Sequence, residues 1–353
     1  MASLVVQTSF LGDVVLTTPL IAELAKRGDV DVLTTRPGAE ILSNNPAIRD
    51  TIVYDRRGAD RGLSGFARIV RLVRNSALHG GVATAPTRAS KRSTNRYDVA
   101  YMAQGSLRSA ALSLAAGVPH RVGFDTSAGR ALYTERVRYQ PDQHHAERLL
   151  SLAFSDCADP LGAEQLRPRL YPGEDERRVV DKLLAGAGIG EPFVALAPGS
   201  AWGTKRWPFY PELAALIAER FPVVVVGGNG EIESGDNIVA QLASGRGVNA
   251  AGRLSLLASA EVIGRAAAMV GNDSAPQHLA SAMATRTVTI YGPTVPAFGF
   301  GPLTPRSETA GVSGLACRPC DRHGPARCPL GHWRCMRELS SRQVYEILIQ
   351  ALS

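Results

Sequence analysis

Polar side chains follow several apolar segments of this chain, where strands of a sheet would end. Gly12 and Asp13 come directly after the first apolar segment. Ser200 and Lys205 follow a segment near the middle, and Asp273 follows a later one. The carboxyl ends of parallel strands are where α/β sheets bind ligands. A carboxylate in the front half, with a lysine and a carboxylate in the back half, predicts a cleft between two domains.

Asp13 is a candidate general base. Gly12 permits a tight turn from strand to helix. The helix dipole and the free N–H groups then favour an ionised carboxylate at Asp13. Such a carboxylate could take a proton from an incoming hydroxyl group. An aspartate that caps the helix is the alternative, and the motif alone does not decide between the two.

The run of residues 271–278 is a stronger signal for a binding site. A proline marks the first turn of a helix there. The N–H groups of Ser274 and Ala275 would therefore form an anion site. Asp273 could hold sugar hydroxyls, and His278 lies one turn into the helix. Helix capping would explain Asp273 but not the whole run, and a packing or surface role is the alternative for His278.

Three further polar residues fit a site for a nucleotide diphosphate. The ammonium group of Lys205 could neutralise a diphosphate, and the flanking Trp202 and Trp207 argue against a freely solvated lysine. Ser200 could donate a hydrogen bond to a phosphate oxygen. Glu231 could accept one from a ribose hydroxyl, although helix capping is an equal alternative.

Four cysteines near the C-terminal end have the spacing of a metal site: Cys317, Cys320, Cys328 and Cys335. Thiolates at such spacing suit tetrahedral zinc. A second short C-x2-C pair is missing, so free thiols in a loop are an equal alternative, and either role would be structural. Five cysteines without a recognisable secretion signal indicate a reducing cytoplasm, and Cys157 is predicted to be a buried thiol.

Length, composition and charge narrow the class of protein. The chain has 353 residues, of which 45% are hydrophobic and 20% charged, as in an ordinary globular protein. This length favours two domains, and no apolar run is long enough to span a membrane. The net charge of +7 favours an anionic partner, which could be a phosphorylated lipid, a membrane surface or nucleic acid.

Apolar strand-like segments alternate with helical patterns in both halves, which predicts doubly wound parallel sheets in an α/β fold. The predicted strands are 4–6, 30–35, 51–54, 97–101, 193–197, 223–226, 269–270 and 287–290. The predicted domains are 1–175 and 190–340, and a final helix in 341–353 is expected to pack back on the first domain. Residues 80–96 are predicted to form a basic loop.

Several other functions fit parts of the sequence. A dehydrogenase is disfavoured because no G-x-G-x-x-G pattern follows a strand. The Asp29-Val30-Asp31 segment matches the minimal D-x-D metal motif of some glycosyltransferases, but this match is a two-residue coincidence. A basic nucleic-acid-binding protein with a zinc module is disfavoured by 6% aromatic residues and by the lack of a recognisable reader motif. A nucleotide-sugar epimerase would need the same site for a nucleotide diphosphate and its sugar, so it is a further alternative.

The ordered set of motifs resembles glycosyltransferase family 9, the ADP-heptose:lipopolysaccharide heptosyltransferases. The segments that carry the resemblance are 8–19, 116–123, 198–200, 205–208, 271–278 and 317–336. The cysteine-containing segment is most similar to the branch that adds the second heptose. Phe10, where a small residue is expected, and the long 80–96 loop depart from the pattern.

This resemblance implies a GT-B fold, in which two Rossmann-like domains face a cleft. The implied reaction is an inverting transfer of heptose from ADP-L-glycero-D-manno-heptose to the inner core of lipopolysaccharide. The implied acceptor is Kdo-lipid A that already bears a heptose, at the anionic inner membrane of a Gram-negative bacterium and on its cytoplasmic side. No cofactor is expected for the chemistry, and a structural zinc is possible. The nearest alternative is another family 9 transfer, of the first or a later heptose or of a different sugar.

The resemblance also implies roles for particular residues. Asp13 would be the general base, Lys205 would hold the donor diphosphate, and Asp273 would contact the heptose. The donor site as a whole would comprise Ser200, Lys205, Glu231, Leu254, Asp273, Ser274, Ala275 and His278, with Leu254 against the adenine. The acceptor anions would be bound by Arg56, Arg57, Arg108 and Arg121.

Overall fold

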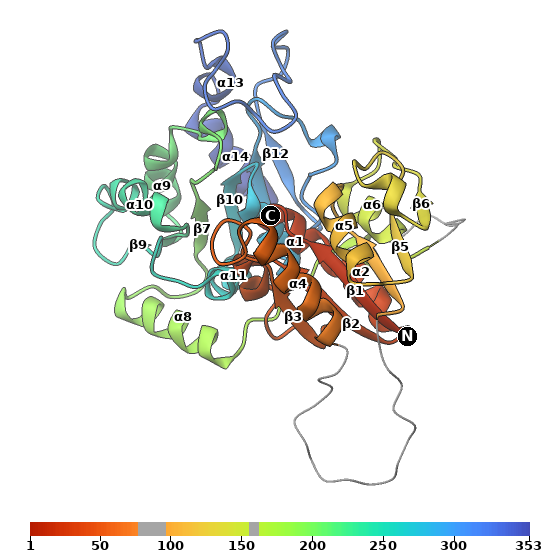
Figure 1. Ribbon diagram of the computed structural model, residues 1–353. Helices are drawn as coiled ribbons and strands as arrows, with labels where there is room; N and C mark the ends of the chain where they lie inside the picture. The colour runs from red at the N-terminus through yellow and green to blue at the C-terminus, as the bar shows by residue number, and fades with distance from the viewer. Residues whose placement is uncertain (77–96, 155–161) are drawn as a thin grey trace. The chain divides into compact units, whose positions relative to one another are not determined.

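The computed structural model describes residues 1–76, 97–154 and 162–353, which form two compact units (Figure 1). The first unit comprises Met1–Glu40 and Asn45–Gly162, and the second comprises Ile41–Asn44 and Ala163–Ser353. The predicted basic loop 80–96 and Cys157 lie outside the described residues. None of the described helices combines the length and apolar character needed to cross a bilayer.

The first unit is built on a parallel sheet of six strands in the order β3-β2-β1-β4-β5-β6. Its strands are β1 (Ala2–Gln7), β2 (Asp29–Thr34), β3 (Asp50–Val53), β4 (Val99–Met102), β5 (His120–Phe124) and β6 (Glu135–Val137). Every residue of β1 is buried, as expected for the central strand of a sheet covered on both faces.

Helices follow the strands of the first unit. They are α1 (Leu11–Leu16), α2 (Thr18–Ala25), α3 (Arg36–Ile41), α4 (Gly62–Ser76), α5 (Leu107–Ala115) and α6 (His145–Ser151), with a 3-10 turn η1 (Arg130–Leu132). Helix α4 packs beside α5, and α6 packs beside α1 and α2. Helix α4 turns Ile69 and Val73, four residues apart, into the core with β1 and β4 residues.

The second unit repeats this topology in a sheet of order β12-β11-β10-β7-β8-β9, again with parallel pairs. Its strands are β7 (Val194–Ala197), β8 (Val223–Val225), β9 (Gly247–Asn249), β10 (Ala268–Asn272), β11 (Thr287–Ile290) and β12 (Glu308–Ala310). Two six-stranded parallel sheets confirm the predicted doubly wound α/β fold class.

The helices of the second unit surround this sheet. They are α7 (Ala163–Leu166), α8 (Glu174–Gly186), α9 (Tyr210–Ala218), α10 (Ile232–Val239), α11 (Leu256–Arg265), α12 (Ala275–Ala282), α13 (Arg334–Arg337) and α14 (Ser341–Leu352). Short 3-10 turns are η2 (Gly203–Lys205), η3 (Asn229–Glu231) and η4 (Pro296–Phe298).

Two predictions about domain limits need correction. Helix α14 was expected to pack on the first domain, but it lies in the second unit against α9 and β11. The reason is its apolar stripe of Val344, Leu348 and Ala351, which belongs to the core of the second unit. The first unit also ends at Gly162, before the predicted limit at residue 175. Helix α8, which follows this limit, packs on α11 of the second unit.

The strand order reverses at one place in each sheet. In the first unit the reversal lies between β1 and β4, and in the second it lies between β7 and β10. A reversal leaves room between the connections that leave the carboxyl ends of the two strands, which is where open α/β sheets bind ligands. Asp13 follows β1, and Asp273 follows β10, so both candidate carboxylates lie at such points.

Candidate active site

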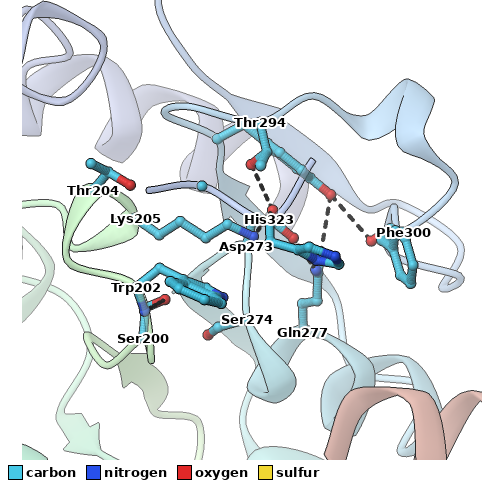
Figure 2. A network of polar contacts seen from close by, with 12 residues as sticks. Ser200, Trp202, Thr204, Lys205, Asp273, Ser274, Gln277, Thr294, Phe300 and His323 are labelled. Carbon is cyan, nitrogen blue, oxygen red and sulfur yellow. Dashed lines mark hydrogen bonds and ion pairs between the residues drawn. The ribbon is translucent and has the colours of Figure 1, made fainter. Parts of the chain in front are cut away.

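A buried ion pair lies at the strand-order reversal of the second sheet (Figure 2). Lys205 ends the turn η2 that follows β7, and Asp273 is the first residue after β10. The Lys205 Nζ atom lies 2.6 Å from Asp273 Oδ2, and the two side chains are only 10% and 9% exposed. The alternative of a freely solvated lysine is therefore wrong.

Other donors fix the Asp273 carboxylate in place. Thr294 Oγ1 donates to Oδ2 over 2.6 Å, and Gln277 Nε2 donates to Oδ1 over 2.8 Å. The Tyr291 hydroxyl donates to Gln277 Oε1 over 3.2 Å. Burial raises the pKa of Tyr291 well above its usual value, so this hydroxyl remains a donor. Figure 2 shows Lys205, Thr294 and Gln277 grouped around Asp273.

The pair leaves donor capacity on the lysine. An ammonium group carries three N–H donors, and the contact with Asp273 uses one of them. The Cε atom of Lys205 lies close to Gly324, because a Cβ atom added to Gly324 would be 3.3 Å from it. The arrangement can therefore present an oriented cation to an anionic or hydroxyl-bearing ligand.

The start of α12 lies directly beside this pair. Ser274, not Asp273, occupies the N-cap position, without a capping hydrogen bond from its side chain, so the capping alternative for Asp273 is wrong. The Ser274 hydroxyl donates to the Gly199 carbonyl over 3.1 Å and ties α12 to the loop after β7. Ala275 is the first helical residue, and His278 is buried one turn further on. The first-turn N–H groups of α12 are the kind that bind anions.

Ser200 and Glu231 come from neighbouring loops at the same edge of the sheet. Ser200 Oγ accepts the Trp202 N–H over 3.3 Å. Glu231 Oε2 accepts the Gly228 N–H over 3.0 Å, so the capping alternative for Glu231 is observed. A Cβ at Gly199 would lie 2.6 Å from Glu231 Cγ, which shows that these loops pack closely. Leu254 is half-buried just before α11, after β9.

Asp13 lies in the first turn of α1, and Phe10 occupies the N-cap position without a side-chain hydrogen bond. The capping alternative for Asp13 is therefore wrong as well. Its side chain is 21% exposed. Ser9 Oγ donates to Asp13 Oδ2 over 2.7 Å, and the same hydroxyl lies 2.6 Å from Gln7 Oε1. The carboxylate is thus held in one orientation while part of it stays accessible to a substrate.

The sequence did not point to His145, which also contacts Asp13. His145 Nε2 lies 3.5 Å from Asp13 Oδ1, and both residues belong to the first unit. His145 is the first residue of α6, more than a hundred positions along the chain, and α6 packs on α1. The only signal that could have found it is a pair of adjacent histidines before a helical pattern, which is a weak one.

The four arginines expected to bind the acceptor lie in different places. Arg56 and Arg57 are exposed in the turn after β3, and the Arg108 guanidinium lies 5.9 Å from the Tyr54 ring centre. Arg121 lies near the amino end of β5, the opposite end from Asp13, level with Ala100 of β4. It donates to the carbonyls of Val118, Pro119 and Leu132. This geometry gives the acceptor role of Arg121 no support.

The cysteine segment packs beside the ion pair. The Cys320 N–H donates to the Pro293 carbonyl over 2.9 Å, and Arg318 donates to the Thr294 carbonyl. Burial raises the pKa of the Cys335 thiol to about 11. Cys317 Sγ lies 3.8 Å from His332 Nε2. Among the residues that the structure describes, no three potential ligands are grouped so as to hold a metal ion.

Comparison with known proteins identifies the family to which this chain belongs. The family model described as glycosyltransferase family 9 (heptosyltransferase) matches residues 89–330. The chain belongs to glycosyltransferase family 9. This membership agrees with the resemblance seen in the sequence and identifies the family as one of glycosyltransferases.

Individual members of family 9 give the same result. Lipopolysaccharide heptosyltransferase 2 of Escherichia coli K12 is 32% identical over 217 residues, which span 58% of this chain and 62% of that enzyme. Lipopolysaccharide heptosyltransferase 1 of Pseudomonas aeruginosa is 30% identical over 334 residues, or 91% of this chain and 86% of that enzyme. The solved structure of E. coli ADP-heptose lps heptosyltransferase II superposes with a TM-score of 0.75 at 25% identity, covering 100% of this chain and 98% of that one.

Proposed function

We propose that this family 9 protein transfers heptose from ADP-L-glycero-D-manno-heptose to the inner core of lipopolysaccharide. The observation that carries the proposal is the buried Lys205–Asp273 pair beside the first turn of α12, at the strand-order reversal of the second sheet. This edge offers a cation and N–H donors for a diphosphate, and a fixed carboxylate for sugar hydroxyls.

The proposed reaction is a single displacement with inversion at the anomeric carbon. Asp13 accepts the proton of the acceptor hydroxyl, whose oxygen forms a bond to that carbon. The bond from the carbon to the diphosphate oxygen breaks, and ADP leaves with the electron pair. Lys205 and the N–H groups of Ser274 and Ala275 stabilise the charge that develops on the leaving group, an effect worth ~10²–10³ in rate for one donor.

The acceptor that we propose is Kdo-lipid A bearing one heptose, which makes this the transfer of the second heptose. The cysteine-containing segment supports this choice over the first heptose. The identities of about 30% to both kinds of enzyme do not distinguish them. Arg56, Arg57 and Arg108 lie on loops and helices that follow β3 and β4, and they would meet the acceptor anions. The proposed location is the cytoplasmic face of the inner membrane.

Product analysis with defined acceptors tests this function. The purified protein is incubated with ADP-heptose and with Kdo-lipid A carrying no, one or two heptoses, and the lipid products are identified by mass spectrometry. We expect mass gain of one heptose on the acceptor that carries one. Consumption of ADP-heptose without any acceptor would favour an epimerase instead. Transfer to the heptose-free acceptor alone would reassign the enzyme to the first heptose.

Substitution of Asp13 tests the role of the base in the same assay. Asp13→Asn keeps the size of the side chain but cannot accept the proton, so turnover should fall ~10²–10⁴-fold. Asp175→Asn, at an exposed position of α8, is the matched control and should retain full turnover. Normal turnover of Asp13→Asn would reject the proposed base.

The zinc assignment for Cys317, Cys320, Cys328 and Cys335 stays a prediction. Metal analysis of the purified protein, compared with Cys328→Ser, tests it directly. One equivalent of zinc that is lost in the variant is the expected result for a bound metal. Absence of zinc in both proteins would favour free thiols.

A further inference from the structure

Helix α4 presents an unusual outer face. Its inner face buries Ile69 and Val73, with Phe66 and Val70 packed beside them. The exposed residues Leu63, Arg71 and Arg74 lie on one side of the helix, and together with Arg61, just before the helix, they are called the α4 surface here. Leu63 is 86% exposed, the highest value among the large hydrophobic residues of the described chain. A leucine therefore projects into solvent beside arginines on this face.

The charge of this region is almost entirely positive. Residues 56–75 contain six arginines: Arg56, Arg57, Arg61, Arg68, Arg71 and Arg74. The only acidic residue in the same stretch is Asp60, which is fully buried and paired with Arg68. Asp55, just before the stretch, directs its carboxylate to the N–H groups of Gly58 and Ala59. Much of the positive charge behind the net charge of +7 is therefore concentrated on and around the outer face of α4.

The neighbouring helix α5 extends this face. Arg108 donates to the Gly62 carbonyl over 3.3 Å, and its guanidinium lies 5.8 Å from the Phe66 ring centre. These contacts join the first turn of α5 to the first turn of α4. Leu107, next to Arg108, is also exposed. Two leucines, Leu63 and Leu107, therefore lie with several arginines on adjoining turns.

We propose that the α4 surface docks the first unit onto a bilayer that contains anionic lipid. Each arginine near such a surface contributes about 1 kcal/mol through attraction to lipid phosphates. Leucines beside the arginines can enter the apolar side of the headgroup region. Binding to a nucleic acid backbone would use the arginines but would leave the leucines in water, which makes the bilayer the better match.

The position of α4 makes this docking useful for the proposed function, on which this inference rests. Parallel strands β1 and β3 end at the same edge of the sheet, and eight residues separate the end of β3 from the start of α4. The first turn of α4 therefore lies at the edge that carries Asp13. Docking through α4 brings this edge to the surface in which a lipid-anchored acceptor resides.

Vesicle flotation without any sugar nucleotide tests the docking alone. The protein is mixed with vesicles of phosphatidylcholine, with and without phosphatidylglycerol, at low salt. We expect binding only with phosphatidylglycerol. The double variant Arg71→Gln/Arg74→Gln should bind about 30-fold more weakly, since it loses two arginine contacts. Leu63→Ser should also weaken binding, and circular dichroism verifies the fold of each variant.

Matched variants in the second unit serve as controls. Arg178→Gln/Arg342→Gln removes two exposed arginines, and Leu330→Ser removes an exposed leucine. Both should bind vesicles like the parent protein. Equal binding to neutral vesicles, or equal losses in the controls, would overturn the proposal. So would an oligonucleotide that displaces the vesicles and binds through the same arginines.

Failure of the docking proposal and failure of the proposed function give different results. With an acceptor lacking acyl chains, the α4 variants should transfer heptose at the parent rate, because no bilayer is involved. With the acceptor in vesicles, they should be slower. Heptose transfer without any dependence on α4 refutes the docking. Vesicle binding that depends on α4, without heptose transfer by any variant, refutes the function.

Discussion

At the scale of single residues, Asp13 and Asp273 show how similar local sequences give carboxylates with different chemistry. Each aspartate lies between a buried strand and the start of a helix. Asp13 stays partly exposed beside one hydroxyl and one imidazole, whereas Asp273 is buried among an ammonium, a hydroxyl and an amide. The first arrangement suits a group that receives a proton, and the second suits a group that orients other atoms.

The contact of His145 with Asp13 leads to a prediction about orientation of the base. His145→Phe removes the donor to Asp13 Oδ1 and should lower kcat ~10-fold to 10²-fold, since a small misplacement of a reacting group has effects of this size. His145→Gln keeps an N–H donor and should recover most of the rate. Steady-state kinetics should show a change in kcat with little change in the KM for ADP-heptose. Equal rates for the Phe and Gln variants would contradict the positioning role.

The Lys205–Asp273 pair permits stability to be separated from activity. Lys205→Met leaves the Asp273 charge buried without its ammonium, and should lower the free energy of unfolding by about 3–5 kcal/mol as well as turnover. Lys205→Met/Asp273→Asn removes both charges and should regain much of the stability but none of the turnover. Urea unfolding and kinetics on the same samples provide the test. A double variant with normal turnover would exclude both residues from the reaction.

At the scale of elements, strands formed by apolar runs were predictable from sequence, including the edge strand β3, whereas β5, β6, β9 and β12 were not. The predicted 193–197 and 287–290 closely match β7 and β11, because apolar runs mark strands buried on both faces. The three-residue edge strands β6, β9 and β12 were missed, since Glu135, Asn249 and Glu308 interrupt any apolar run. Pairing with a neighbouring strand, rather than local sequence, makes these residues strands.

The Asp29-Val30-Asp31 motif illustrates the same limit. It matches a metal-binding pattern, but the structure uses Asp31 to accept hydrogen bonds from Tyr97 and Arg49. Asp29 also pairs with Arg49. This confirms that the match was a coincidence. The partners Arg49 and Tyr97 lie just before β3 and just before β4, so only the folded sheet shows what these carboxylates do.

The turn at Gly324 connects the cysteine segment to the ion pair, and this leads to a third prediction. Gly324 has a φ of +85°, and an added Cβ would lie 3.1 Å from Pro293 Cγ, 3.2 Å from Thr204 Oγ1 and 3.3 Å from Lys205 Cε, all at the donor site. Gly324→Ala should cost about 1 kcal/mol in backbone strain and should also displace Lys205, which raises the KM for ADP-heptose.

A matched glycine in the same segment provides the control for this substitution. Gly331 has a φ of +70° but nothing within 4 Å of an added Cβ. Gly331→Ala should therefore lose similar stability in thermal unfolding without any effect on the KM for ADP-heptose. Equal KM values in the two variants would show that the cysteine segment does not influence the donor site.

At the scale of the whole molecule, each unit has its own sheet and core, and the candidate groups are divided between them. The alternation of strands and helices predicted two such units, because each βαβ pattern can be read locally. The limits of the units were harder to predict. The place of α14 depends on which apolar surface its Val344 and Leu348 meet, and both halves of the sequence offer apolar helices and strands.

This division predicts where ADP should protect the backbone from hydrogen exchange. If the second unit binds the nucleotide, exchange should slow in 198–206 and 271–278, which surround Lys205 and Asp273, and stay unchanged in 8–13 around Asp13. ADP at 100 times its Kd would stabilise the state that binds it by about 2.7 kcal/mol, enough to slow local opening about a hundredfold. Exchange measured by mass spectrometry, with ADP and with adenosine as a ligand that lacks the diphosphate, separates the phosphate contacts from those of the base. If adenosine, which has no diphosphate, protected 271–278 as strongly as ADP does, this would contradict a diphosphate site at α12. Protection confined to 8–13 would place the nucleotide in the first unit and reverse the assignment of donor and acceptor.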